Sequence, residues 1–456
     1  MKSEHVSRIV KAYDIRGVVP DELDEVTAHR VGAAFAELVN MPRIAVAHDM
    51  RDTSPALAAA FTDGVLQQGV DVVDAGMGST DYLYFVSGHL CLPGAMFTAS
   101  HNIAAYNGIK LCRAGAVPVG EGSGLERIRA RLLDGGPGPA AHRGARRAVD
   151  LLDDYGLYLR SLVDISALRP LKVVIDAGNG MAGLTAPLVL AHPNLDLVPM
   201  SFELDGAFPS HDVDPLKPVD VAALKARVRA EEADLGLAFD GDADRCFAVD
   251  ERGEAIPASS VIALVAARLL AREPGASVVH NLVTSRAAVE VVKEAGGVPV
   301  RSRVGHSFVK SLMARNNAVF GGEHSGHYYY RDFWFADTGM LTALHLLAEL
   351  SAADGPMSKL VDPHDRYPRS GEVNLDVADP VHTLAELEDS LRDSGAELDH
   401  LDGLTATFAD GSWFNLRASN TEPVVRFNAE APTDSRLGEL QARILDLVAA
   451  AEPAVV

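Results

Sequence analysis

Short apolar runs that end in polar loops recur at three places along the chain, each followed by a segment with helix-like spacing. The runs occupy residues 43–51, 171–180 and 276–286. After the first and third runs, residues 54–69 and 285–297 carry apolar side chains at helical spacing and close on glycine. Another apolar run follows each of these two helices, and this alternation is typical of α/β domains with largely parallel sheets. The runs start about one domain length apart, which predicts three similar α/β units.

The C-terminal part of the chain has a different pattern. In residues 405–419, Asp-Gly separates two stretches that alternate between apolar and polar positions, which predicts a β-hairpin. Residues 433–452 carry apolar side chains at helical spacing, which predicts an amphipathic helix with Thr433 or Asp434 as its N-cap. This part of the chain therefore predicts a smaller α+β domain.

Two polar segments that contain proline resemble linkers between these units, namely residues 134–148 and 361–371. A length of 456 residues allows about three or four domains. We therefore expect an α/β protein with three similar mixed-sheet domains and one smaller C-terminal α+β domain. The predicted domains are residues 1–145, 146–252, 253–366 and 367–456.

Composition and charge narrow the class of protein. The chain is 48% hydrophobic and carries a formal net charge of -22, which argues against a nucleic-acid partner because such a partner needs a basic face. Anions can still bind, but only in a locally positive cleft. Three cysteines without metal or redox spacing fit a reducing cytosol. The most apolar run, residues 259–271, is too short to span a bilayer and carries Arg268, so it predicts a core helix and no membrane partner.

Residues 235–245, LGLAFDGDADR, form the clearest chemical signal. An apolar strand ends in Asp240, Asp242 and Asp244, whose carboxylates can converge on one cation. The alternative is a solvated acidic turn, but three carboxylates at a strand end repel one another unless a cation neutralises them. Mg²⁺ is favoured over Ca²⁺, because three side-chain oxygens leave positions open for water and a phosphate oxygen.

A serine loop lies upstream, at residues 98–110, TASHNIAAYNGIK. Ser100 is followed directly by His101, and Lys110 lies ten residues further on. The residues alone leave two alternatives open, which are a nucleophilic serine and a loop serine that caps a neighbouring element.

A glycine-bounded loop within residues 319–339 contains Glu323 and Ser325 two positions apart, followed by His327. A carboxylate and a hydroxyl between glycines suit hydrogen bonds to neighbouring sugar hydroxyls. The alternative is an aromatic-flanked turn with a structural glutamate, and the segment alone does not decide between them.

Three further segments carry polar groups that a ligand could use. Residues 417–423, RASNTEP, follow the predicted hairpin and could cradle a phosphate, although for the segment alone a capped turn is the slightly better explanation. AYDIRG places Tyr13 and Arg16 near the start of the chain, and GHSFVK places His306 and Lys310 four positions apart, on one face of a helix if the segment is helical. The residues concerned are Tyr13, Arg16, His306, Lys310, Arg417, Ser419, Asn420 and Thr421.

In this order, the four main motifs resemble the α-D-phosphohexomutase superfamily, and most closely its bacterial phosphomannomutase and phosphoglucomutase group. The resemblance is carried by TASHN with YNGIK, DGDADR, GEHSGH and RASNTEP, and it covers nearly the whole chain. It implies four domains around a central cleft, with one motif from each domain. It also implies a phosphoryl group on Ser100 that passes to a hexose phosphate through a hexose 1,6-bisphosphate intermediate.

The resemblance also implies a site, with Mg²⁺ as cofactor and hexose phosphates as the small-molecule partners. The expected metal ligands are Asp240, Asp242, Asp244 and the phosphorylated Ser100. The expected catalytic residues are Ser100, His101, Lys110, Arg245, Arg16, His306 and His327. The expected substrate ligands are Tyr13, Glu323, Ser325, His327, Lys310, Arg417, Ser419, Asn420 and Thr421.

Some positions depart from the family pattern. Ile103 occupies a place where proline is common, which puts the rigidity of the serine loop in doubt, and Val283 lies near a position where some members carry lysine.

We expect a cytoplasmic phosphomannomutase that is a monomer or a homodimer. The alternatives are a phosphoglucomutase, a dual-specificity mutase, a metal-dependent phosphatase and a catalytically silent phosphosugar-binding protein.

Overall fold

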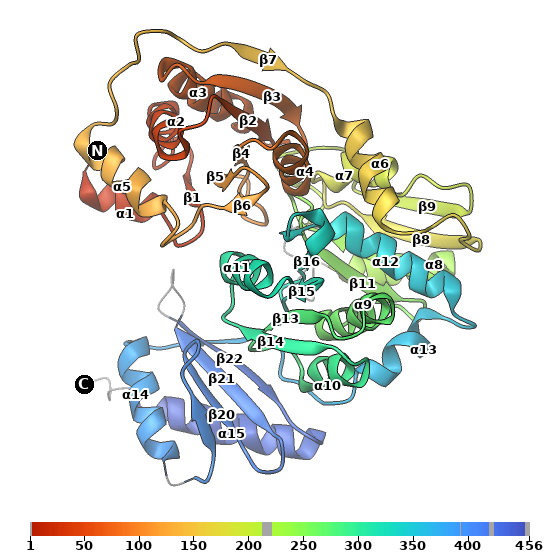
Figure 1. Ribbon diagram of the computed structural model, residues 1–456. Helices are drawn as coiled ribbons and strands as arrows, with labels where there is room; N and C mark the ends of the chain where they lie inside the picture. Colours follow the sequence, from red (N-terminus) through yellow and green to blue (C-terminus); the bar gives the residue numbers. More distant parts are fainter. Residues whose placement is uncertain (1, 212–220, 393, 419–423, 452–456) are drawn as a thin grey trace.

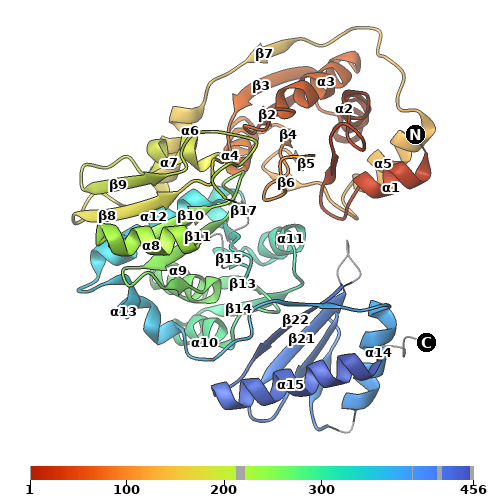
Figure 2. The same ribbon diagram turned by 180° about the vertical axis from the view of Figure 1, so that it is seen from behind.

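The computed structural model describes residues 2–211, 221–392, 394–418 and 424–451 of the chain. Its four sheets follow one another along the sequence. Figure 1 shows the four units in sequence order along an arc, and Figure 2 shows the same arrangement from behind. Within the described ranges, no helix combines the length and the apolar character needed to cross a membrane.

The first unit is built on a seven-stranded sheet. Its strands are β1 (Ile15–Val18), β2 (Arg43–His48), β3 (Asp71–Met77), β4 (Gly94–Phe97), β5 (Tyr106–Arg113), β6 (Val117–Pro118) and β7 (Arg146–Ala148). Its helices are α1 (Ser3–Ile9), α2 (Glu25–Val39), α3 (Ser54–Gln67), α4 (Thr80–Leu90) and α5 (Leu125–Asp134). β2 lies parallel between β3 and β4, β4 pairs antiparallel with β5, and β5 pairs antiparallel with β1.

The second unit repeats this arrangement. Its strands are β8 (Leu171–Asp176), β9 (Leu195–Met200), β10 (Leu235–Phe239), β11 (Cys246–Asp250) and β12 (Ala255–Ile256), with helices α6 (Leu152–Leu162), α7 (Ala182–Val189) and α8 (Ala222–Glu231). β8 lies parallel between β9 and β10, β10 pairs antiparallel with β11, and β11 pairs antiparallel with β12.

The third unit has the same order of parallel and antiparallel pairs, so the prediction of three similar α/β units is confirmed. Parallel β13 (Ser277–Asn281), β14 (Val298–Ser302) and β15 (Phe320–Gly322) are followed by antiparallel β16 (Tyr328–Tyr330) and β17 (Ala336–Asp337). The helices are α9 (Ala258–Arg272), α10 (Arg286–Glu294), α11 (His306–Asn316), α12 (Gly339–Ala352) and α13 (Met357–Val361), with 3₁₀ turns η1 (Arg331–Phe333) and η2 (Asp362–His364).

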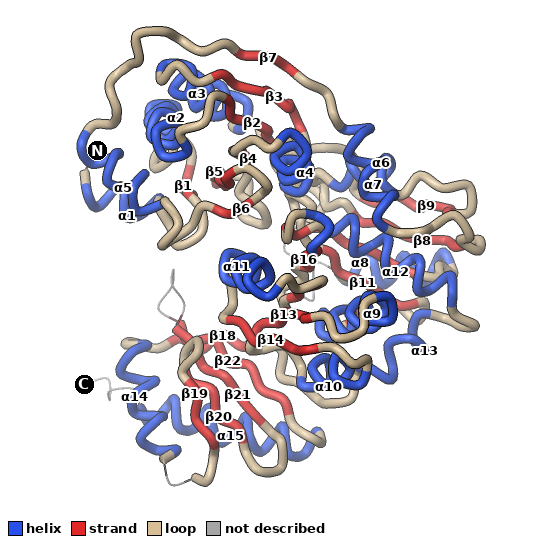
Figure 3. The backbone as a smooth tube through the Cα atoms, in the orientation of Figure 1, coloured by secondary structure: helices blue, strands red, loops and turns tan. Residues whose placement is uncertain are grey.

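The fourth unit is the predicted smaller domain, in which helices lie beside a sheet (Figure 3). All pairs in this sheet are antiparallel. It contains β18 (Val373–Asp376), β19 (Glu397–Asp399), β20 (Leu404–Thr407), β21 (Trp413–Ala418), β22 (Val424–Glu430), α14 (Pro380–Leu391) and α15 (Asp434–Ala451). β20 and β21 form the hairpin expected at Asp-Gly. Thr433 is the N-cap of α15, because its hydroxyl accepts from the Arg436 N–H at 3.3 Å.

One segment differs from its prediction as a linker. Residues 146–148 form β7, which adds a parallel edge strand to the first sheet beside β3. All three residues are exposed, so no apolar pattern marks the strand. Pairing is supported instead by side chains of β3, since Asp74 accepts from Arg146 and Asp71 accepts from the Ala145 N–H.

A buried carboxylate joins the first three units. Asp81, on α4, accepts hydrogen bonds from Tyr155 on α6 at 2.7 Å and from Thr338, the N-cap of α12, at 2.6 Å. Ser79 also donates to Asp81. Burial raises the pKa of Asp81 to about 7, although the three hydroxyl donors oppose this shift.

Asp81→Asn is expected to change how stability depends on pH. Below pH 3.8 the Asp81 carboxyl is protonated in both states, and between pH 3.8 and about 7 the folded protein holds a proton that the unfolded chain releases. Stability from this group is therefore present at low pH and is lost as the pH rises through 7. When the pH is raised from 5 to 8, the free energy of unfolding of the variant, measured with denaturant, should increase by a few kcal/mol relative to that of wild type. The exposed control Asp154→Asn should show no such trend. A pH-independent difference for Asp81→Asn would contradict this expectation.

Candidate functional site

The serine loop follows β4 and turns sharply at Ser100. This residue has a left-handed backbone, with φ of 50°, and is 5% exposed. Its Oγ donates to Asp240 Oδ2 at 2.7 Å and lies 3.3 Å from His101 Nδ1. A left-handed serine is strained, by about 1–2 kcal/mol, so the surrounding structure must hold the loop in this shape. The first unit thereby presents one hydroxyl to a carboxylate of the second unit.

The acidic loop connects two antiparallel strands of the second sheet. β10 is fully buried and leads directly into Asp240, and β11 follows the loop. The side chains of Asp240, Asp242 and Asp244 are at most 1% exposed. Gly241 allows the serine loop to approach, since a Cβ there would lie 2.6 Å from the Ser100 carbonyl oxygen.

Cationic side chains surround these carboxylates. Lys110 Nζ lies 2.6 Å from Asp242 Oδ2 and 2.7 Å from Asp244 Oδ2, and Arg245 Nε lies 2.9 Å from Asp240 Oδ2. Burial raises the pKa of Asp240 to about 7 in spite of Arg245. Burial also disfavours the charge on Asp242, but Lys110 outweighs it, and the pKa of Asp242 falls below its usual range. The two carboxylates in turn outweigh the burial of Lys110 and raise its pKa, which keeps it an ammonium group.

The acidic loop fits a hard divalent cation. One carboxylate oxygen from each aspartate lies within 4.8 Å of the others. In the part of the chain that the structure describes, Asp242 Oδ1 is buried and makes no hydrogen bond. Such an oxygen is costly to bury without a partner, and an all-oxygen donor set suits Mg²⁺.

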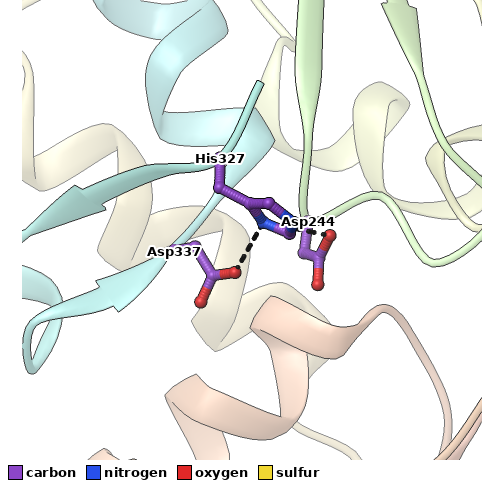
Figure 4. A group of neighbouring side chains, drawn as sticks. All are labelled: Asp244, His327 and Asp337. Atoms are coloured by element: carbon purple, nitrogen blue, oxygen red, sulfur yellow. Dashed lines mark hydrogen bonds and ion pairs between the residues drawn. The ribbon is translucent and has the colours of Figure 1, made fainter. Parts of the chain in front are cut away.

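A second group of titratable side chains adjoins the acidic loop (Figure 4). His327 Nδ1 lies 2.9 Å from Asp337 Oδ2 and 3.6 Å from Asp244 Oδ1. Lys310 Nζ lies 2.6 Å from Asp337 Oδ1 and 3.9 Å from the centre of the Tyr84 ring. Ligand atoms of Asp244, His327 and Asp337 lie close enough together to hold a metal. However, the Lys310 ammonium group already neutralises Asp337. The group is therefore a hydrogen-bonded histidine–aspartate pair.

The charges of this pair fix the position of its proton. Burial disfavours ionisation of Asp337, but Lys310 and His327 outweigh it and hold the pKa of Asp337 well below its usual range. Burial lowers the pKa of His327, whereas Asp244 and Asp337 raise it, and the net shift is upward. Since Asp337 is ionised, His327 Nδ1 donates to it, and Nε2 is the nitrogen left for proton transfer.

Glu323 lies at the end of β15 and is 1% exposed. Its Oε1 accepts from the Gly305 N–H at 2.8 Å, and its Oε2 accepts from the Tyr329 hydroxyl at 2.5 Å. Ser325 is half-buried in the turn that follows. Both oxygens of the predicted sugar ligand Glu323 are thus engaged within their own unit, so a sugar hydroxyl would share or replace these contacts.

The remaining candidates lie around this centre. Arg16 donates to the Ala99 carbonyl oxygen at 3.3 Å and also to Asn102 of the serine loop. Tyr13 packs edge-on against His306 with ring centres 5.4 Å apart. Burial lowers the pKa of His306 to about 3, and Lys310 adds to this shift, so His306 is neutral at ordinary pH.

Arg417 lies on β21 and donates to Glu372 Oε2 at 2.6 Å. Glu372 also lies 3.4 Å from His324 and from Arg426. Burial opposes ionisation of Glu372, but these neighbours outweigh it and lower its pKa to about 2. Ser419, Asn420 and Thr421, the other predicted phosphate ligands, lie outside the described residues.

The structure therefore brings nine of the predicted residues into one group that links three units. The connected set is Arg16, Ser100, His101, Lys110, Asp240, Asp242, Asp244, Arg245 and His327, joined through the contacts above. Sequence reasoning missed Arg51, Thr80 and Asp337. Thr80 donates to Asp242 Oδ2 at 2.5 Å. The available signal for Arg51 was the pair of charged residues, Asp49 and Arg51, directly after the buried strand β2.

Comparisons with known proteins agree with this geometry. Four models of the phosphoglucomutase/phosphomannomutase family match in order, for alpha/beta/alpha domain I at residues 7–134, domain II at 153–253, domain III at 257–367 and the C-terminal domain at 372–447. The chain is 42% identical to the phosphohexose mutases of Xanthomonas campestris pv. campestris, over 94% of this chain and 96% of that protein.

Two further relatives are similar over nearly their full length. The phosphomannomutase of Escherichia coli K12 is 40% identical over 95% of this chain and 97% of that protein. The crystal structure of a phosphoglucomutase/phosphomannomutase family protein from Burkholderia thailandensis has a TM-score of 0.89 and 32% identity, with 98% of each chain covered. The chain belongs to the phosphoglucomutase/phosphomannomutase family of the α-D-phosphohexomutase superfamily and is a phosphohexomutase, an intramolecular phosphotransferase.

Proposed function

We propose that this phosphohexomutase interconverts mannose 6-phosphate and mannose 1-phosphate, with Ser100 as the phosphoryl carrier and a hexose 1,6-bisphosphate as the intermediate. The observation that carries the proposal is the contact of 2.7 Å between Ser100 Oγ and Asp240. A hydroxyl that donates to one of three clustered, buried carboxylates has little structural use by itself. With a cation bound there, the same hydroxyl can carry a phosphoryl group.

In the first half-reaction, a sugar hydroxyl oxygen forms a bond to the phosphorus of phosphorylated Ser100, and the bond from Ser100 Oγ to phosphorus breaks. The bisphosphate then reverses its orientation in the site, and Ser100 takes back the other phosphoryl group. Such transfers depend mainly on in-line positioning and on neutralisation of charge. Asp240, Asp242 and Asp244 would hold Mg²⁺, which when bound supplies positive charge beside the phosphoryl oxygens.

The cationic side chains divide into two roles. Lys110 and Arg245 stay protonated beside the carboxylates, so we assign them to stabilising the charge of the transferring group. Arg16 flanks Ser100 and takes the same role from the other side. Burial, Arg245 and Arg16 together hold the pKa of His101 well below its usual value, so His101 is a neutral hydrogen-bond partner beside Ser100. His327 is the proton acceptor for the sugar hydroxyl, through Nε2, and His306 is a neutral neighbour that can hydrogen-bond to the substrate.

Asp337→Asn is expected to lower kcat by about 10²-fold and to leave KM for the sugar phosphate within about twofold. The amide can hold either histidine tautomer, so His327 would lose its fixed proton arrangement. Steady-state kinetics with mannose 1-phosphate measure this effect. Asp332→Asn, at a carboxylate that is 69% exposed, is the control and should be unchanged. An unchanged kcat in Asp337→Asn would remove His327 from the proton transfer.

Substrate binding is proposed for the loops that face this centre from the third and fourth units. Glu323 and Ser325 would read two sugar hydroxyls, and Arg417 would bind the phosphate that does not react, together with Ser419, Asn420 and Thr421. Tyr13 and Lys310 complete the set, although Lys310 is 3% exposed and paired with Asp337. For Lys310, contact with the substrate would be indirect, through Asp337 and His327.

The sugar preference rests on relatives of about 40% identity that carry the names phosphomannomutase and phosphohexose mutase. Mannose and glucose differ only at C2, so a dual-specificity mutase or a phosphoglucomutase is the second candidate. The test compares kcat/KM for mannose 1-phosphate and glucose 1-phosphate side by side, with Mg²⁺ and a trace of hexose 1,6-bisphosphate. A clear mannose preference supports the proposal, similar values indicate dual specificity, and a strong glucose preference overturns it.

The setting of the reaction is also part of the proposal. Cys91, Cys112 and Cys246 are all free thiols, which favours the reducing cytoplasm. The partners are hexose phosphates alone, handled by a monomer or a homodimer.

A further inference from the structure

Arg51 lies just after β2 and is the side chain that shapes the serine loop. Its Nη2 donates to the carbonyl oxygens of Ser100 at 2.9 Å and Asn102 at 2.6 Å, and its Nη1 donates to those of Ile103 and Tyr106, both at 3.0 Å. One guanidinium therefore binds four carbonyl groups that span the whole loop.

The burial of Arg51 excludes a direct contact with substrate. Its side chain is 1% exposed, and its Nε pairs with Asp49 at 3.3 Å. Both Nη atoms are used by the loop, so no donor faces a ligand. Burying a guanidinium costs several kcal/mol unless its hydrogen bonds are satisfied. Here the two Nη atoms are satisfied by three carbonyl groups of the loop and by that of Tyr106, the first residue of β5, while Nε has the ion pair with Asp49.

The second unit holds the same loop from its other side. The Phe208 ring lies 4.8 Å from the Arg51 guanidinium. A Cβ at Gly206 would lie 2.7 Å from Arg51 Cα, and a Cβ at Gly241 would lie 2.6 Å from the Ser100 carbonyl oxygen. The loop is thus enclosed between Arg51 and the acidic loop, which fixes the distance between Ser100 and Asp240.

Hydrogen bonds within the loop are short-range, such as those from the Ser100 N–H to Thr98 Oγ1 and from the Asn102 N–H to the Ala99 carbonyl oxygen, both at 3.0 Å. Ser100 has a left-handed backbone, a conformation that a serine leaves readily when it is not held. Ile103 is 59% exposed and has no proline ring, so neither burial nor a fixed φ restrains it. Arg51 therefore replaces local stiffness by four long-range hydrogen bonds.

We propose that Arg51 is a positioning residue for phosphoryl transfer, which fixes the serine loop so that Ser100 Oγ faces Asp240 and the transferring group lies in line. This proposal rests on Ser100 being the phosphoryl carrier. The planar fork of arginine is essential, because a lysine ammonium has no rigid geometry with which to hold carbonyl groups on two sides.

The test is Arg51→Lys, which keeps the charge and removes the fork. A loop displacement of about 1 Å is expected to slow Ser100 phosphorylation by labelled hexose 1,6-bisphosphate about 10²-fold in a single turnover. KM for mannose 1-phosphate should stay within about twofold, since no substrate contact is lost. Arg252→Lys, at an exposed ion pair with Asp250, is the matched control and should keep the wild-type rate.

A second readout does not depend on the reaction. Hydrogen exchange of peptides covering residues 98–106 should accelerate in Arg51→Lys, while peptides from the second, third and fourth units should not change. Wild-type protein that takes no label on Ser100 would contradict the proposed function, and exchange would still test Arg51. Wild-type transfer rates or unchanged loop exchange in Arg51→Lys would overturn the proposal. Failure of the variant to fold would also overturn it, by assigning Arg51 to the folding core.

Discussion

Replacement of Ser100 by alanine is expected to reduce mutase turnover by about 10⁵-fold or more, because it removes the atom that carries the phosphoryl group. Loss of a covalent nucleophile costs this much even where binding survives. The substitution should leave the fold intact, since the hydrogen bonds of Ser100 Oγ within the described ranges are those to Asp240 and His101. KM should be measurable only if residual activity remains.

A coupled assay with mannose 1-phosphate and hexose 1,6-bisphosphate measures this loss. Ser161→Ala is the matched control, because Ser161 is exposed and its hydroxyl only donates to the Tyr158 carbonyl oxygen within a helix. The control should keep full activity. If Ser100→Ala retained more than about one hundredth of the wild-type rate, a phosphoserine route would be excluded.

Removal of divalent metal is expected to reduce turnover by about 10³-fold, and Asp242→Asn should reproduce the loss even with excess Mg²⁺. Asp242 Oδ1 is buried without a hydrogen bond among the described residues, which identifies it as a free ligand atom. Its Oδ2 already accepts from Thr80 and Lys110. The variant therefore loses one metal ligand and leaves Lys110 with one carboxylate fewer.

Activity should be measured after EDTA treatment and after addition of Mg²⁺ or Ca²⁺. Mg²⁺ should restore turnover and Ca²⁺ should restore little, because Ca²⁺ forms longer bonds in a looser geometry and would hold the phosphoryl oxygens less tightly than octahedral Mg²⁺. Asp153→Asn, at an exposed position on α6, serves as the control. Full activity in EDTA would show that the three aspartates serve folding and not phosphoryl transfer.

The sequence allowed the repeated architecture to be predicted because local signals marked its parts. Buried parallel strands such as β2 and β10 read as apolar runs, and Asp-Gly marked the turn between β20 and β21. The strand β7 was not predicted, because its three residues are exposed. Its pairing is supported by Asp71 and Asp74 of β3, a strand more than seventy positions earlier. Such pairing through exposed polar side chains leaves no alternation of apolar and polar residues in the sequence.

The centre of the site could be predicted in outline, because Ser100, Asp240, Asp242 and Asp244 each lie in a short motif. The side chains that hold them could not be predicted. Arg51 reaches a loop that begins some fifty positions later, and Asp337 on β17 is paired with Lys310 on α11. These contacts depend on packing between distant segments, and a list of motifs gives no distances. The proposed roles of Glu323 and Arg417 remain predictions, since both side chains are bonded to protein groups here.

The central claim is that Ser100 carries the phosphoryl group between the two ends of the sugar. The most direct measurement incubates the purified enzyme with ³²P-labelled hexose 1,6-bisphosphate and Mg²⁺, maps the labelled peptide, and then adds unlabelled mannose 6-phosphate. We expect label on the peptide that contains Ser100, and its transfer to the sugar at a rate no slower than kcat. Absence of label on Ser100, or label that the sugar phosphate does not remove, would contradict the account.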